Sequence, residues 1–207
     1  MSVSSELIDA VIKGQLAPVL KQAGFKRSGR NWHQSHERSV VVVNVQASAF
    51  NTPEQTRFTI NLGVWFPELA EFQPANLQPS NRLRPTEPHC HFRQRVGGLL
   101  PGGLDRWWEL GSVADVELVG VSASEALTTY GLPWLRDRSE PVDALNVRLS
   151  ECGVMVSLIV DCGLALIADR PDIASSMFHK WLIDSDTYGD SEQVTSGISW
   201  AKQHNLG

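Results

Sequence analysis

The stretch that decides the fold runs from Val40 to Phe66 and contains two strand-length segments, Val-Val-Val-Val-Asn-Val-Gln-Ala-Ser (40–48) and Arg-Phe-Thr-Ile-Asn-Leu-Gly-Val-Trp-Phe (57–66). In the first segment the odd positions are apolar, whereas the even positions turn polar from Asn44 onward. In the second segment the even positions are all apolar, and the odd positions are mostly polar or small. Because successive side chains of a strand point to opposite faces, the two segments predict antiparallel strands with one buried face and one open face.

A third segment, His-Cys-His-Phe-Arg-Gln-Arg-Val (89–96), alternates in the same way, with its His and Arg residues on one parity. If that parity faces the same side as the amides of the first two strands, the open face gathers guanidinium, imidazole, carboxamide and hydroxyl groups. Arginine offers paired donors in a fixed geometry, and amides complete the shell around an anion. The face is therefore predicted to bind a carboxylate or phosphate through these candidate residues: Gln46, Ser48, Asn61, Trp65, His91, Arg93 and Arg95.

Two plainer interpretations of the same face stay open. In one, the outer face of a one-sided sheet is simply exposed to solvent and binds no ligand. In the other, the arginines form structural ion pairs with Glu37 or Glu109. Under either interpretation the opposite parity forms the core. The residues expected to be buried there are Val43, Val45, Ile60, Leu62 and Phe92.

Helices are expected both before and after these strands along the chain. A first helix is expected to be capped by Ser4 or Ser5 and to stop at Gly24. Pro18 should kink or divide it, because proline lacks a backbone donor and clashes with the preceding turn. Five prolines within residues 67–88 argue against regular structure there. The pattern Ser122-Ala-Ser-Glu125 is expected to cap a helix that ends at Gly131.

The C-terminal half is predicted to be helical throughout. Further helices are expected to begin at Pro141 and Pro171 and to cover 155–168 and 191–205. The fold class is therefore α+β, with an N-terminal antiparallel sheet packed on a helix and a helical C-terminal half. We expect an α+β domain over residues 1–135 and a helical extension over residues 136–207 that packs on it as one structural unit.

Composition narrows the class of protein. The chain has 207 residues and a net charge of −5, with 12 Lys/Arg against 8 Asp/Glu in residues 1–106 and 6 against 15 in residues 107–207. A net acidic chain without basic clusters argues against nucleic-acid binding, which requires neutralised phosphates. The odd number of cysteines, the charged N-terminal segment and the short longest apolar run predict a cytoplasmic protein without a membrane segment.

Known catalytic and cofactor patterns are not found in the sequence. His33, His36, His89 and His91 suggest a metal site, but the spacing matches no zinc motif, and strand parity sends Cys90 away from the neighbouring imidazoles. The glycine-rich run at 97–103 lacks the Gly-Lys-Ser/Thr ending of a phosphate loop, and no nucleophile elbow occurs. The sequence therefore predicts no metal and no cofactor.

Several motifs together resemble a known family. They include Gly-Phe-Lys-Arg at 24–27 followed by Trp32, Asn-Val-Gln-Ala-Ser at 44–48, Phe-Thr-Ile-Asn-Leu-Gly-Val at 58–64, Cys-His-Phe-Arg-Gln-Arg-Val-Gly at 90–97, Trp107-Trp108, and Gly-Leu-Pro-Trp-Leu at 131–135. In combination they resemble the bacterial family catalogued as domain of unknown function 4304, over about residues 16–135. The resemblance implies a bacterial origin and a domain boundary, and it leaves the activity open because the family has none established.

Three hypotheses for function follow from these patterns. The leading one is a non-catalytic ligand- or protein-binding module that uses the polar sheet face, together with the proline-rich segment 67–88, for an anionic small molecule or a protein partner. The alternative is an enzyme acting on an anionic small molecule, with Arg93 and Arg95 binding charge and His91 as acid/base. A third hypothesis is an immunity-type protein whose acidic helical half neutralises a basic partner.

Overall fold

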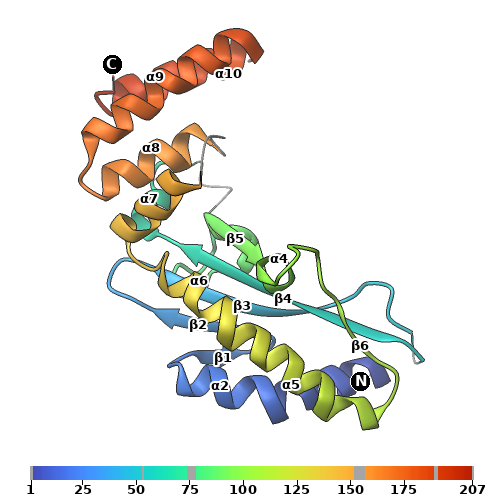
Figure 1. Cartoon of the computed structure of the whole chain (residues 1–207). Helices are drawn as coiled ribbons and strands as arrows, with labels where there is room; N and C mark the ends of the chain where they lie inside the picture. Colours follow the sequence, from blue (N-terminus) through green and yellow to red (C-terminus); the bar gives the residue numbers. More distant parts are fainter. Residues whose placement is uncertain (1, 53, 74–77, 152–156, 189–190, 207) are drawn as a thin grey trace. The chain divides into compact units, whose positions relative to one another are not determined.

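The computed structural model describes residues 2–52, 54–73, 78–151, 157–188 and 191–206 (Figure 1). The chain divides into two compact units. Unit 1 comprises residues 1–65 and 79–136, and unit 2 comprises residues 66–78 and 137–207. The fold is α+β, as the sequence predicts.

Within the described residues, neighbouring strands of the sheet of unit 1 pair antiparallel. Its order is β1-β2-β3-β4-β5, and β6 pairs with another part of β4. The strands are β1 (Lys26–Ser28), β2 (Asn31–Ser35), β3 (Val40–Ala47), β4 (Thr56–Trp65), β5 (Phe92–Arg95) and β6 (Trp108–Leu110). The prediction that the segments at 40–48, 57–66 and 89–96 share one antiparallel sheet is confirmed, although the third strand is shorter than expected.

The register confirms the predicted parity. Asn44 lies opposite Asn61, and Asn61 lies opposite Arg95 on the next strand, so all three project from the same face. On the other face, Val43, Val45, Ile60 and Leu62 are buried as expected. Phe92 is only half-buried, so its predicted place in the core is wrong. It belongs to β5, which comes last in the strand order and, among the described residues, pairs with β4 alone.

Two helical segments lie side by side on the apolar face of the sheet (Figure 1). The first runs through α1 (Val3–Val11), a π-helical segment (Ile12–Leu16) and α2 (Ala17–Gln22). The second runs through α5 (Val116–Ala126), a π-helical segment (Leu127–Gly131) and α6 (Leu132–Arg136). Pro18 lies in the first turn of α2, so the first helix is divided where the sequence predicts, through a π turn that keeps the chain helical.

The expected helix cap at Ser122 is wrong. The capping box is formed by Ser112 and Asp115 instead, and the helix has already begun by Val116. The helix also continues past Gly131 and through Pro133 into α6. The preceding π turn, in which the Leu132 N–H donates to the Leu127 carbonyl, lets the chain absorb a proline that otherwise ends a helix.

Short helices occur where the sequence predicts none. Pro67 begins α3 (Pro67–Ala70), because proline suits the first turn of a helix, where its missing donor has no partner to lose. A 3₁₀ turn covers Glu87–His89, so His89 lies before the strand rather than in it. A single helical turn, α4 (Val96–Leu99), lies in part of the glycine-rich run.

Unit 2 is a group of helices. Its elements are α3, α7 (Pro141–Ser150), α8 (Leu158–Ile167), α9 (Pro171–Tyr188) and α10 (Ser191–Gln203), and the predicted helix starts at Pro141, Pro171 and Ser191 are confirmed. The predicted start at Met155 lies outside the described residues. Asp161 on α8 is buried and accepts from the Arg148 guanidinium of α7 at 2.7 Å. Segment 66–78 groups with these helices, and the predicted packing of the helical extension on the α+β domain stays a prediction.

Candidate functional site

A chain of carboxamides crosses the polar face of the sheet from β2 to β4. Asn44 donates to Asn31 at 2.9 Å, while Asn61 donates to the side-chain oxygens of Asn44 at 3.2 Å and Gln46 at 2.8 Å. Asn61 is only 4% exposed, whereas Gln46 is exposed. The buried amide therefore fixes the position of an exposed one, and both carboxamides belong to the predicted site. We call Asn31, Asn44, Gln46 and Asn61 the amide row.

An arginine on the neighbouring strand extends the amide row. Arg95 lies directly opposite Asn61 and donates from Nη1 to Asp105 at 2.6 Å. Its guanidinium stacks over the Trp107 ring, 5.4 Å from the ring centroid, and the Trp107 indole N–H donates to the same Asp105 carboxylate at 3.2 Å. Among the described residues, the other guanidinium nitrogens of Arg95 form no hydrogen bond, and the side chain is 41% exposed. Arg95 is therefore oriented by its neighbours, and its remaining guanidinium nitrogens are available as donors.

Arg93 shares the face but belongs to a separate ion pair. It lies opposite Gly63 and donates to both carboxylate oxygens of Glu87, at 2.7 and 3.3 Å. The hydrogen bonds to Glu87 raise the pKa of the Arg93 guanidinium, so its charge is satisfied within the fold. The two arginines thus have a carboxylate each, rather than a single counter-charge shared between them.

Trp65 and His91 lie on the predicted side of the sheet but away from its exposed part. Their rings stack with centroids 6.5 Å apart, and Trp65 is 1% exposed. Burial lowers the pKa of His91 to about 4, so its imidazole is neutral near neutral pH. Trp65 packs under residues 79–91, which we call the covering segment, and His91 is the residue of that segment that stacks on it.

The covering segment is held to the sheet by further contacts. The His33 ring nitrogen Nε2 lies 2.9 Å from the Pro85 carbonyl, and burial is the main cause that lowers the pKa of His33. Cys90 packs against Gly63, where an added Cβ would lie 2.5 Å from the Cys90 sulfur. The polar face is therefore covered at this end, and the expectation of a fully open face is wrong there, because strand parity does not report what a loop covers.

Ser48 lies beyond the end of β3. Its hydroxyl accepts from the Phe50 backbone N–H at 3.1 Å, as expected of a serine in a turn. The structure thus brings Gln46, Asn61 and Arg95 together and places Ser48, Trp65, His91 and Arg93 around them in structural contacts.

Sequence reasoning did not assign four residues of this surface to the site. Asn44 has the polar parity of the first segment and could have been assigned from that pattern, whereas Asn31 lies on β2, outside the three segments whose alternation was used. Asp105 and Trp107 come from the loop and strand end beyond the glycine-rich run, where no periodicity signals which sheet position they approach.

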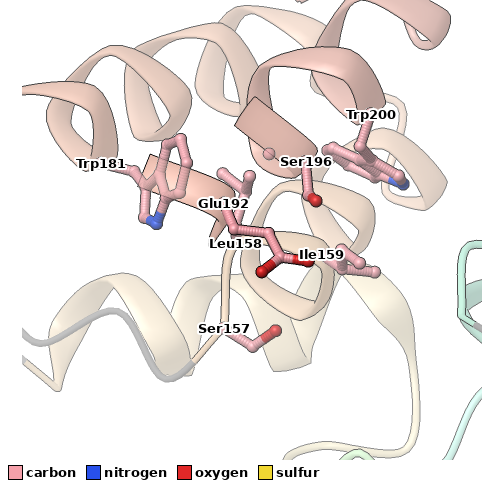
Figure 2. A pocket seen from close by; sticks show the side chains of 8 residues that line it. Ser157, Leu158, Ile159, Trp181, Glu192, Ser196 and Trp200 are labelled. Atoms are coloured by element: carbon pink, nitrogen blue, oxygen red, sulfur yellow. The ribbon is translucent and has the colours of Figure 1, made fainter. Parts of the chain in front are cut away.

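Two cavities lie elsewhere in the molecule. In unit 1 a cavity of about 300 Å³ is lined by apolar side chains that include Phe25, Val41 and Leu132, with Gln34 and His36 among its polar groups. In unit 2 a cavity of about 490 Å³ is lined by Trp181 and Trp200 together with Glu192 (Figure 2). Neither is lined by the residues of the amide row.

Within the described ranges, no three His, Cys, Asp or Glu side chains form a group that could hold a metal ion. No helix in that part of the chain is both long and apolar enough to cross a membrane.

The fold and the site together define an α+β domain whose antiparallel sheet presents an amide row on one face and packs helices on the other. The chain belongs to the family described as Domain of unknown function (DUF4304), whose family model matches residues 16–137. The match ends one residue after unit 1 does, so the amide row, Arg95 and Trp107 all lie within it. No curated protein and no solved structure matches the chain.

Proposed function

We propose that the chain is a non-catalytic binding module and that the amide row with Arg95 takes an anionic group of its ligand. One observation carries the proposal: the buried Asn61 amide holds Gln46 in place beside an arginine that has donors left for a ligand. A ligand anion bound there would accept from the Gln46 amide and from the guanidinium of Arg95.

The geometry supports recognition of a small ligand. Strands in a sheet lie ~4.8 Å apart and rise ~3.4 Å per residue. Gln46 on β3 is level with Thr59, two residues from the Asn61–Arg95 pair, so Gln46 and Arg95 start from backbones roughly 12 Å apart. Two long side chains reaching inward across that interval suit a group the size of a carboxylate or phosphate. Because the Asn61 bonds and the Trp107 stacking already restrict these side chains, less conformational entropy is lost on binding.

The state of His91 favours binding over the enzymatic alternative. An acid/base group requires access to the substrate and a pKa near the working pH. Here the imidazole is stacked on buried Trp65, and its pKa of about 4 lies far below neutrality, so near neutral pH there is almost no imidazolium to donate a proton and the neutral ring is a weak base.

We further propose that this module works in the cytoplasm of a bacterium. Cys90 and Cys162 are buried free thiols, and burial raises the pKa of both, to about 12 for Cys162. Thiols of this kind are packed as small apolar residues, as is usual in a reducing compartment. The net charge of −5 supports a ligand other than nucleic acid.

A thermal-shift experiment with inorganic phosphate and succinate, at ionic strength matched with sodium chloride, tests the proposal. At least one anion should raise the melting temperature of the wild type, because a ligand that binds only the folded state stabilises it. Gln46→Ala and Arg95→Gln should lose that shift. Arg170→Gln is the matched control, because Arg170 is also an exposed arginine paired with a carboxylate, that of Asp172. Equal shifts in all four proteins would overturn the proposal.

A further inference from the structure

Unit 2 is strongly acidic. Residues 66–78 and 137–207 contain 5 Lys/Arg against 13 Asp/Glu, a net charge of −8. The remaining residues contain 13 against 10, a net charge of +3, so all of the excess negative charge of the chain lies in unit 2. A surface of one sign raises the local concentration of ions of the other sign.

A cavity within this acidic unit has two tryptophans in its walls. It lies among the first turn of α8 and the helices α9 and α10, and Figure 2 shows Trp181 and Trp200 on opposite sides of it in the view. At about 490 Å³ it falls within the range of small-molecule sites.

Both indole rings are held by neighbours rather than left mobile. Gly197 on α10 packs against Trp181 so closely that an added Cβ would overlap the ring, and Phe178 stacks on Trp181 with centroids 6.1 Å apart. Trp200 packs edge-on against Phe72, with ring centroids 5.9 Å apart, and at a tilt against His204, with centroids 4.6 Å apart. The aromatic walls are therefore preorganised.

A carboxylate lines the same cavity. Figure 2 shows the Glu192 side chain projecting between the two indoles in the view, with the hydroxyls of Ser157 and Ser196 also lining the cavity. Among the described residues, no side chain forms an ion pair or hydrogen bond with Glu192. Its first-turn position on α10 stabilises the helix N-terminus, and that role alone does not require two tryptophans around it.

We propose that this cavity binds a small organic ammonium ion. The π faces of tryptophan attract cations more strongly than those of tyrosine or phenylalanine, and the Glu192 carboxylate supplies the counter-charge. The hydrocarbon part of such an ion suits the apolar walls contributed by Leu158 and Ile159. This site lies in unit 2 and takes a cation, so it is independent of the anion-binding function proposed for the sheet of unit 1.

Choline and its neutral isostere 3,3-dimethylbutan-1-ol test the proposal on the full chain, because they share a shape and differ in charge. The readout is the indole N–H signals of Trp181 and Trp200 in ¹H–¹⁵N spectra, assigned by single Trp→Phe substitutions. Choline should shift both signals saturably, and the neutral isostere should bind at least ~10-fold more weakly.

Two substitutions that each remove one negative charge distinguish binding in the cavity from attraction by the net charge of unit 2. Glu192→Gln should weaken choline binding by at least ~10-fold. Asp143→Asn removes an exposed carboxylate from α7, outside the cavity lining, and should leave binding unchanged. Melting temperatures and far-ultraviolet circular dichroism of each variant verify that the fold is retained.

Gly197→Ala provides a second test that leaves every charge in place. The added methyl group displaces the Trp181 ring, so choline binding should weaken although Glu192 is present. Equal affinity for choline and its isostere would overturn the proposal, and so would an unchanged affinity in Glu192→Gln. Equal losses in Glu192→Gln and Asp143→Asn would mean attraction by net charge alone and would overturn it as well.

Discussion

At the scale of single residues, Asn61 connects the fold to the candidate site. Its backbone lies in the central strand β4, and its buried amide donates to two side chains of β3. The buried Asn61 amide donates to the side-chain oxygen of exposed Gln46, so the position of Gln46 depends on the interior of the sheet. The strand pattern predicted which side Asn61 faces, but it did not predict that this part of the face is buried.

Asn61→Asp should destabilise the protein by about 1–3 kcal/mol at neutral pH, because an ionised carboxylate cannot donate to Asn44 and Gln46. Burial would raise the pKa of this carboxyl in the folded state above its unfolded value. The destabilisation should therefore be greatest above the folded pKa and should diminish as the pH falls through it.

Urea denaturation of the wild type and Asn61→Asp between pH 4 and pH 7 measures this difference. The exposed Asn146→Asp on α7 is the matched control and should change stability by less than about 0.5 kcal/mol. A destabilisation of Asn61→Asp that does not depend on pH would contradict the hydrogen-bonding role of the amide.

His91 gives a second pH-dependent prediction. Its folded pKa of about 4 lies below the ordinary value of 6.5, so the unfolded chain binds more protons between those values. Stability should therefore fall as the pH drops below about 6.5, by roughly 1.4 kcal/mol per unit of pKa difference, or about 3 kcal/mol near pH 4. Desolvation of the imidazolium is the physical cause.

His91→Phe keeps an aromatic ring on Trp65 and removes the titrating group. The stability of this variant, measured by urea denaturation, should fall less steeply with acid than that of the wild type. The comparison concerns the slopes, since carboxylates titrate in both proteins. Parallel curves would show that burial of His91 does not set the acid sensitivity.

At the scale of elements, the sheet and the covering segment differ in how far the sequence predicts them. Strands β3 and β4 were predictable because alternation over many residues reports two-sided burial. The covering segment was not, because its attachment depends on a ring stack, a glycine contact and one backbone carbonyl, and none of these has a period. The helix from Val116 was misplaced for a related reason, since Ser112 and Ser122 both resemble helix caps in sequence.

Gly63→Ala should loosen the covering segment. The added Cβ would lie 2.5 Å from the Cys90 sulfur and 2.7 Å from the Cys90 Cβ, so the strand or the segment must shift. We expect a loss of stability of about 1–3 kcal/mol and faster amide hydrogen exchange within residues 79–91.

A second substitution tests the cause. Cys90→Gly removes both clashing atoms, so the double variant should be less destabilised than the two single variants predict by addition. Gly14→Ala is the control, because nothing lies within 4 Å of its added Cβ. Unchanged exchange in the covering segment of Gly63→Ala would contradict the proposed attachment.

At the scale of the whole molecule, the α+β class and the order of sheet before helices follow from the change of period along the chain. The grouping of residues 66–78 with the later helices does not follow from that change of period. This segment lies within the sequence of unit 1 but belongs to unit 2 through its tertiary contacts. For the candidate site, parity predicted Gln46, Asn61 and Arg95. The contributions of Asp105 and Trp107 depend on the path of a loop, which local patterns do not report.

The interruption predicts how a truncated chain behaves. A fragment of residues 1–136 retains segment 66–78 but lacks α8, so the partners of buried Leu69 and half-buried Phe72 are missing. The fragment should bind the dye 8-anilinonaphthalene-1-sulfonate and self-associate, because it exposes apolar side chains. The same fragment with Leu69→Ser and Phe72→Ser should do so less, as size-exclusion chromatography would measure. Equal association of both fragments would contradict the assignment of residues 66–78 to unit 2.

The most direct test of the proposed binding surface is a titration of the full chain with succinate or inorganic phosphate, followed by the side-chain N–H signals of Gln46, Asn61 and Arg95 in ¹H–¹⁵N spectra. The proposal predicts saturable shifts concentrated on the Gln46 amide and the Arg95 Nε–H, with a smaller shift at Asn61, whose amide hydrogens already have acceptors. Shifts spread evenly over all exposed arginines, or no shift at Gln46 and Arg95, would contradict it.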